Sequence, residues 1–136
     1  MAAPCVRFRI DFAEHSSLGP GKIVLLEAIR DSGSLSQGAR NIGMSYRRAW
    51  LLVESLKKSF REPVTVASTG GKAGGGMVLT EFGDALIKSY RELERDFARL
   101  AARRFRPIIA TVVRRSKSGA KASLHRSLGK AASAHL

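Results

Sequence analysis

The stretch SGSLSQGARNIGMSYRRAWLLVESL, residues 32–56, decides the fold that this sequence predicts. Ser34 followed three residues later by Gln37 is a capping box, which indicates that a helix begins there. Gly43 is expected to end this short helix in a tight turn, and the next helix is expected over residues 45–59. Two helices joined by a glycine-containing turn predict a helix-turn-helix.

The second of these helices has one apolar face and one polar face. Its buried stripe, at spacings of four, three and four residues, is expected to consist of Ala49, Val53, Leu56 and Phe60. At about 100° per residue, Arg47 falls on the opposite face and is expected to point away from the core. Trp50 lies at the edge of the stripe, where we interpret it as a packing residue.

The segments before this stretch predict one strand and one helix. Residues 6–12 alternate between apolar and charged side chains, which is typical of a half-buried strand. Residues 15–20 are expected to form a turn. Residues 22–31 carry apolar side chains near a helical repeat, and Gly33 follows them as helix C-termini often require. We therefore expect a helix over residues 22–31.

Five glycines and one lysine lie in VASTGGKAGGGMVLT, residues 66–80. The flanking residues 64–68 and 77–79 are short apolar segments, so a β-hairpin with a glycine-rich tip is expected. A phosphate-binding loop is excluded, because the residues do not match G-x-x-x-x-G-K-[ST] and a strand rather than a helix follows. Thr80 is a good N-cap for a long helix over residues 80–105.

This order of elements predicts the fold class. It is a mainly α protein with a small β component: a winged helix-turn-helix with a three-helix core and a β-hairpin wing, an N-terminal strand and a long C-terminal dimerisation helix. This DNA-binding domain is expected to span residues 1–106. Residues 107–136 are expected to form a basic, disordered tail, in which residues 108–113 are interpreted as a strand or a short docking segment.

The composition favours a polyanionic partner. The 136 residues include 24 Lys and Arg against 11 Asp and Glu, a net charge of +13, which indicates nucleic acid or an anionic membrane surface. The single cysteine, Cys5, rules out an internal disulfide and a cysteine zinc cluster. The three histidines lack metal-ligand spacing and no nucleophile elbow is present, so we expect no metal site, no catalytic residues and no enzyme. No signal-peptide core and no apolar run near ~20 residues is seen, so a cytoplasmic protein without membrane contact is expected.

Three motifs resemble the DNA-binding domain of the ModE family of molybdate-responsive transcriptional regulators. They are GSxSQGA at residues 33–39, SYxxAW at residues 45–50 and TGGKxGGGxxLT at residues 69–80, and the resemblance extends over residues 21–97. LysR-type regulators share more loosely the LTxxG helix start at residues 79–83. The resemblance implies DNA binding and dimerisation.

The resemblance also has a limit. ModE regulators typically carry, after this domain, two small β-barrel modules that bind molybdate at a dimer interface. Here residues 107–136 follow the long helix, and they are too few and too polar to build such modules. We therefore expect a ModE-type regulator that lacks the molybdate-binding domain and has no cofactor, although the resemblance makes molybdate a candidate ligand.

The candidate DNA-binding residues lie at helix starts and at the hairpin tip. Arg47 is expected to read base edges and Arg48 to bind phosphate, the alternative being a solvated face. Tyr46 lies nearer the core side by angle, so DNA contact and packing both stay open for its hydroxyl. In the hairpin, glycines let the backbone approach DNA and lysine supplies charge. The full set is Ser36, Gln37, Ser45, Tyr46, Arg47, Arg48, Gly71, Lys72 and Gly74.

The long helix is expected to join two copies of the chain. At 1.5 Å per residue it is about 37 Å long, which exceeds what one small core needs. The apolar residues expected at the dimer interface are Phe82, Leu86, Tyr90, Leu93, Phe97 and Leu100. Its charged residues, Arg91 and Glu94 among them, are expected on a solvated face.

The function expected is that of a sequence-specific regulator of transcription that binds double-stranded DNA as a homodimer. Two alternatives stay open. A nonspecific architectural DNA-binding protein is favoured by residues 107–136, which hold six basic and no acidic residues. A winged-helix protein-interaction module is the other, because one fold serves many functions.

Overall fold

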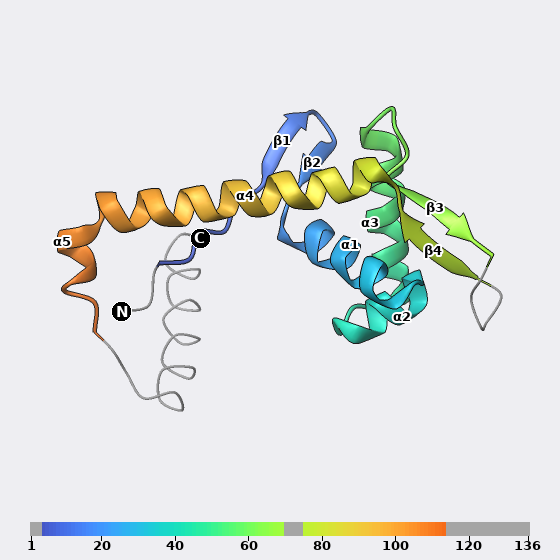
Figure 1. Ribbon diagram of the computed structural model, residues 1–136, viewed down its shortest axis with the longest axis horizontal. Coiled ribbons are helices and arrows are strands. Elements are labelled where there is room, and N and C mark those ends of the chain that lie inside the picture. Colours follow the sequence, from blue (N-terminus) through green and yellow to red (C-terminus); the bar gives the residue numbers. More distant parts are fainter. Residues whose placement is uncertain (1–3, 70–74, 114–136) are drawn as a thin grey trace, which may run out of the picture. The chain divides into compact units, whose positions relative to one another are not determined.

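The computed structural model describes residues 4–69 and 75–113, which are mainly helical with two small antiparallel sheets (Figure 1). The chain divides into two compact units, Met1–Ala101 and Ala102–Leu136, and the division falls within the longest helix. The elements of the described residues are β1 (Ile10–Ala13), β2 (Ser16–Leu18), α1 (Pro20–Ser32), α2 (Leu35–Asn41), α3 (Tyr46–Ser59), β3 (Thr65–Ser68), β4 (Gly76–Leu79), α4 (Glu81–Arg104) and α5 (Arg106–Ile109).

The end of α1 and the start of α2 lie where the sequence indicates, whereas α1 begins at Pro20, two residues before the expected Lys22. Gly33 ends α1 in the left-handed region, with a φ of 80°, and its N–H donates to the Ile29 carbonyl at 2.8 Å. Ser34 caps α2, because its Oγ accepts the Gln37 N–H at 3.0 Å. The reciprocal half of the expected capping box is absent: the Ser34 N–H donates to Ser32 Oγ instead, at 3.4 Å. The Gln37 side chain is turned along α2 and does not reach back.

The N-terminal segment differs from the expected single strand. Val6, Phe8 and Ile10 are half-buried between exposed residues, as the alternation predicts, but β1 begins only at Ile10 and Phe12 is 55% exposed. The expected turn over residues 15–20 was wrong, since β2 lies there and pairs antiparallel with β1. The turn between the two strands is shorter and places His15 at a positive φ of 64°. A strand of three residues with mostly polar side chains shows no alternation of apolar and polar residues, so it cannot be recognised from the sequence.

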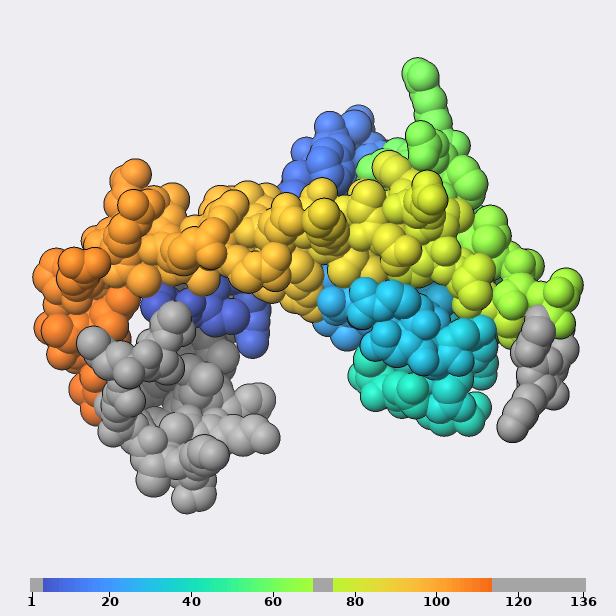
Figure 2. Space-filling view, viewed as in Figure 1, coloured from blue at the N-terminus to red at the C-terminus, as the bar shows by residue number. Residues whose placement is uncertain are grey.

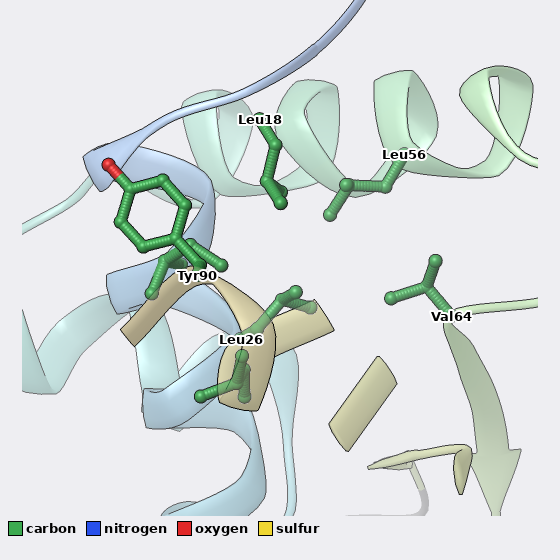
Figure 3. Close-up of a cluster of buried hydrophobic side chains, with 7 residues drawn as sticks. Leu18, Leu26, Leu56, Val64 and Tyr90 are labelled. Carbon is green, nitrogen blue, oxygen red and sulfur yellow. The ribbon is translucent and has the colours of Figure 1, made fainter. Parts of the chain in front are cut away.

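Two core clusters stabilise the first unit, and α1 contributes to both. The first core cluster comprises Leu18, Ile23, Leu26, Leu56, Val64, Ile87 and Tyr90. Figure 3 shows side chains from β2, α1, α3 and α4 meeting in it. The second core cluster comprises Leu25, Ile29, Leu35, Ala39, Ala49 and Val53. The predicted stripe of α3 is thus buried, except that Phe60 is half-buried against Phe12 and Phe82.

Tyr90 belongs to the first core cluster, whereas the sequence predicts it at a dimer interface. Its side chain is 1% exposed, and its ring stacks on Phe8 with 4.5 Å between centroids. Its hydroxyl donates to the Phe8 carbonyl at 2.6 Å. Burial raises the pKa of Tyr90, which keeps this donor protonated. Periodicity alone does not tell a core aromatic from an interface aromatic, because both face the same side of the helix.

Arg91 links α4 to α1. The charge pattern predicts a solvated face for this residue, and that prediction was wrong. Its guanidinium makes two hydrogen bonds to the Glu27 carboxylate, at 2.6 and 3.0 Å, and one to Glu94 at 2.8 Å. The hydrogen bonds to Glu27 raise the pKa of Arg91. The three side chains are about 25–30% exposed, so solvent screens their charges only in part. The two hydrogen bonds between Arg91 and Glu27 therefore hold α4 against α1 more firmly than a fully solvated ion pair would.

The start of α4 is held against the residues before β3. Thr80 Oγ1 accepts the Gly83 N–H at 3.0 Å, which is the expected N-cap, and donates to the Pro63 carbonyl at 2.6 Å. The Thr80 N–H donates to the Val64 carbonyl at 3.0 Å. A Cβ on Gly83 would stand 2.4 Å from that same Val64 oxygen. Only glycine fits at this point of the helix.

The described part of the second unit is short. Residues 106–109 form the one-turn helix α5, with turns after it, where a strand or docking segment was expected over residues 108–113. Pro107 lies in the first turn of α5, a position that suits proline. Residues 114–136 of the predicted tail lie outside the described residues. In the part of the chain that is described, no helix combines the length and the apolar character needed to cross a membrane.

We predict that Gly83→Ala destabilises the first unit by ~2 kcal/mol or more, because the new methyl group must displace backbone. Gly21→Ala is the matched control: a Cβ there meets nothing within 4 Å, and alanine is favoured over glycine in helix α1 by up to ~1 kcal/mol. Urea denaturation of both variants measures the free energies of unfolding. Equal stability of the two variants would contradict this packing.

Candidate nucleic-acid interface

A stretch without acidic residues covers α2, the following turn and most of α3. Residues 32–53 contain Arg40, Arg47 and Arg48 but no Asp or Glu. Gly43 makes the turn between the two helices with a φ of 67°. The N-terminal end of α3 carries the positive end of the helix dipole in addition to its arginines. This surface of the first unit therefore attracts anions.

The first turn of α3 presents its side chains to solvent. Ser45 caps the helix, with its Oγ accepting the Arg48 N–H at 3.1 Å. Arg47 and Arg48 are exposed, as expected. Tyr46 is 58% exposed, so the angle that places it nearer the core side is misleading. The Tyr46 ring and hydroxyl and the guanidinium groups of Arg47 and Arg48 are therefore all accessible to a ligand at this end of the helix.

Trp50 was interpreted as a packing residue, and the structure does not bear this out. Its side chain is 47% exposed and belongs to neither core cluster. The neighbouring Ala49 is fully buried, at 0% exposure. Ala49, not Trp50, is the residue of this turn that enters the second core cluster.

The candidate residues of α2 are exposed but not equivalent. Ser36 and Gln37 both lie on the exposed side of α2. The Gln37 amide donates to Asn41 Oδ1 at 2.7 Å, and its oxygen accepts from Arg40 at 3.5 Å. These contacts along α2 occupy the Gln37 side chain. Ser36 is the more accessible of the two.

The hairpin β3–β4 is attached to the end of α1. Its strands pair antiparallel with Val66 opposite Val78, and Figures 1 and 2 show it standing out from the helices of the first unit. The Met77 N–H donates to the Gly33 carbonyl at 2.9 Å. The hairpin is thereby held next to the point where α2 begins. The three candidate residues of the tip, Gly71, Lys72 and Gly74, lie outside the described residues.

The candidate dimerisation residues divide into two groups along α4. Phe82 and Leu86 pack against the first core cluster, to which Tyr90 itself belongs. Phe97 meets Phe8 edge-to-face, with 4.9 Å between ring centroids. Leu93 is half-buried and Leu100 is 37% exposed. Of the six candidates, Tyr90 is buried, Leu100 is exposed, and the other four are half-buried.

No family model matches the chain. Several curated proteins are similar to it in sequence. It is 43% identical over 83 residues to the molybdenum-pterin-binding protein MopB of Rhodobacter capsulatus, which covers 61% of this chain and 31% of that protein. It is 34% identical over 91 residues to the molybdenum transport protein ModE of Azotobacter vinelandii, covering 67% and 34%. It is 44% identical over 71 residues to the DNA-binding transcriptional dual regulator ModE of Escherichia coli (strain K12), covering 52% and 27%.

Part of this chain is homologous to ModE and Mop proteins. The resemblance to the ModE family that the three motifs suggest is thus confirmed for this part of the chain. The chain spans about a third of the length of these relatives. Among the described residues, no group of three or more His, Cys, Asp and Glu side chains is placed to hold a metal ion.

We predict that Ser45→Ala lowers the free energy of unfolding by about 1 kcal/mol, because the Arg48 N–H loses its partner at the start of α3. Ser36→Ala is the matched control, since Ser36 is exposed within α2 and alanine has the higher helix propensity. Chemical denaturation of both variants is the measurement. A Ser45→Ala protein as stable as Ser36→Ala would show that the cap contributes nothing.

Proposed function

We propose that this chain is a sequence-specific transcriptional regulator of the ModE type that binds double-stranded DNA. In this proposal α2 and α3 form a helix-turn-helix, β3–β4 is the wing, and α3 enters the major groove. The observation that carries the proposal is the exposed, acid-free first turn of α3, with Tyr46, Arg47 and Arg48. The name of the E. coli relative supports it, since that protein is a DNA-binding transcriptional regulator.

The contacts follow from the geometry of the groove. The major groove is about 12 Å wide and admits one α-helix. Arg47 makes two hydrogen bonds to a guanine edge, and Arg48 binds a phosphate beside the groove. Ser36 and Ser45, at the starts of the two helices, bond phosphate. The wing lies on the flanking backbone, where Lys72 binds phosphate and Gly71 and Gly74 permit close approach.

We further propose a homodimer formed through the C-terminal half of α4. Leu93, Phe97 and Leu100 are spaced four and three residues apart and are only partly covered within one chain. Two copies of α4 that share this stripe present two α3 helices to one duplex. Half-sites would then be separated by about one helical turn of DNA, roughly 34–36 Å, or a multiple of it.

The second candidate function is nonspecific DNA binding by charge. Residues 107–136 hold six basic and no acidic residues, and phosphate neutralisation needs no sequence code. Selection of duplexes from a random pool, with and without molybdate, separates the two functions. The proposed regulator, acting in the cytoplasm and needing no cofactor to bind DNA, enriches one operator in both pools. A charge-driven protein enriches none.

We predict that Arg47→Ala weakens binding to the selected duplex by ~1–3 kcal/mol and relaxes the preference at one base position. Arg95→Ala, which removes the same charge from an exposed site on α4, is the matched control and leaves that preference unchanged. Fluorescence anisotropy on selected and random duplexes measures both variants. Equal losses of the Arg47→Ala protein on both duplexes would show that Arg47 does not read a base.

We predict that Leu100→Glu shifts the chain from dimer to monomer, because each subunit would place a carboxylate in the shared apolar stripe. Leu51→Glu is the matched control, since Leu51 is 50% exposed on α3 and lies outside the stripe. Sedimentation equilibrium over a range of protein concentrations gives the dissociation constants. A Leu100→Glu dimer as tight as the unchanged protein would place the dimer interface elsewhere.

A further inference from the structure

Two aromatic side chains stand exposed one helical turn apart on α3. Tyr46 is 58% exposed and Trp50 is 47% exposed, and neither takes part in a ring contact among the described residues. Tryptophan is strongly buried on average in folded proteins. Leu51, which follows Trp50, is also exposed, at 50%. Neighbouring exposed apolar side chains rimmed by polar residues are typical of a binding surface.

The surroundings of Trp50 identify the chemistry of that ligand. Trp50 shares the outward side of α3 with Arg47 and Leu51, both exposed. Its nearest acidic neighbours in sequence are Asp31 and Glu54, which bound a stretch of net charge +3. The face is thus apolar and cationic at once. A duplex major groove matches it, because thymine presents an apolar 5-methyl group beside the acceptors of guanine.

We propose that Trp50 is a specificity-determining residue whose indole packs against the 5-methyl group of a thymine in the major groove. This inference rests on the proposed function and adds a second base reader to it. The rise of 1.5 Å per residue places Trp50 about 4.5 Å beyond Arg47 along α3. Base pairs are about 3.4 Å apart, so this thymine lies within one or two base pairs of the guanine that Arg47 contacts.

Trp50 suits this contact better than its exposed neighbours do. Tyr46 lies at the first position of α3, and its ring carries a hydroxyl group that favours a hydrogen-bond partner over a methyl group. Leu51 is exposed too, but as an aliphatic residue it covers less area than an indole. An apolar contact with a methyl group also needs no hydrogen-bond partner. We therefore expect Trp50, rather than Tyr46 or Leu51, to give this face a preference for thymine that needs no hydrogen bond.

Replacing thymine by uracil tests the inference, because only the 5-methyl group is removed. Each thymine of the selected duplex is replaced singly, and affinities are measured by fluorescence anisotropy for the full chain and its variants. The unchanged protein is expected to lose about fourfold in affinity at one thymine per half-site, the effect of one buried methyl group. Trp50→Ala binds the thymine and uracil duplexes equally at that position. Arg47→Ala retains the fourfold difference.

Two further measurements keep the result interpretable. Trp50→Phe retains an apolar ring and is expected to keep part of the thymine preference, which covers the case in which Trp50→Ala folds poorly. Urea denaturation of each variant shows whether the fold is intact. Loss of the thymine preference in folded Trp50→Ala, its partial retention in folded Trp50→Phe and the full fourfold difference in Arg47→Ala support the inference.

The outcomes separate this inference from the function on which it rests. If the chain prefers its selected duplex but uracil costs the same in the Trp50 variants as in the unchanged protein, Trp50 does not read thymine and the proposed function stands. The same conclusion follows if no thymine of the duplex responds to the replacement. If selected and random duplexes bind equally, the proposed function fails, and this inference fails with it.

Discussion

The burial of α1 on two sides is the constraint from which the arrangement of the first unit follows. Ile23 and Leu26 enter the first core cluster, whereas Leu25 and Ile29 enter the second. Each cluster therefore needs helices on its own side of α1. Gly38 brings α2 to backbone distance, since a Cβ there would stand 3.1 Å from the Ala28 carbonyl carbon. The hydrogen bonds of Arg91 to Glu27 hold α4 against α1 as well.

The surface of α3 is a consequence of this packing. Ala49 and Val53 fill the second core cluster and Leu56 the first, so the inward face of α3 is used completely. The remaining side chains at its N-terminal end have no core to enter and stand in solvent, beside a hairpin that is held by the Gly33 carbonyl. This exposed, basic end of α3 is the surface to which we assign the proposed DNA contacts.

Local signals in the sequence predict the helix boundaries well, because caps and glycine turns are decided within a few residues. Ser34, Gly43, Ser45 and Thr80 all act as their positions indicate. Contacts between distant segments were not predictable in this way. The β1–β2 hairpin, the core role of Tyr90 and the exposure of Trp50 depend on how closely elements approach, which periodicity does not encode. The tip residues around Lys72 remain a prediction.

The most direct test of this account is an amide NMR titration of the full chain with a selected duplex. If α3 reads DNA, the largest chemical-shift changes fall on residues 45–51, with smaller changes in the hairpin and none in the middle of α1. A charge-driven protein behaves differently. Changes confined to residues 107–136, with the amides of α3 unmoved, would contradict the assignment of α3 as the DNA-reading helix.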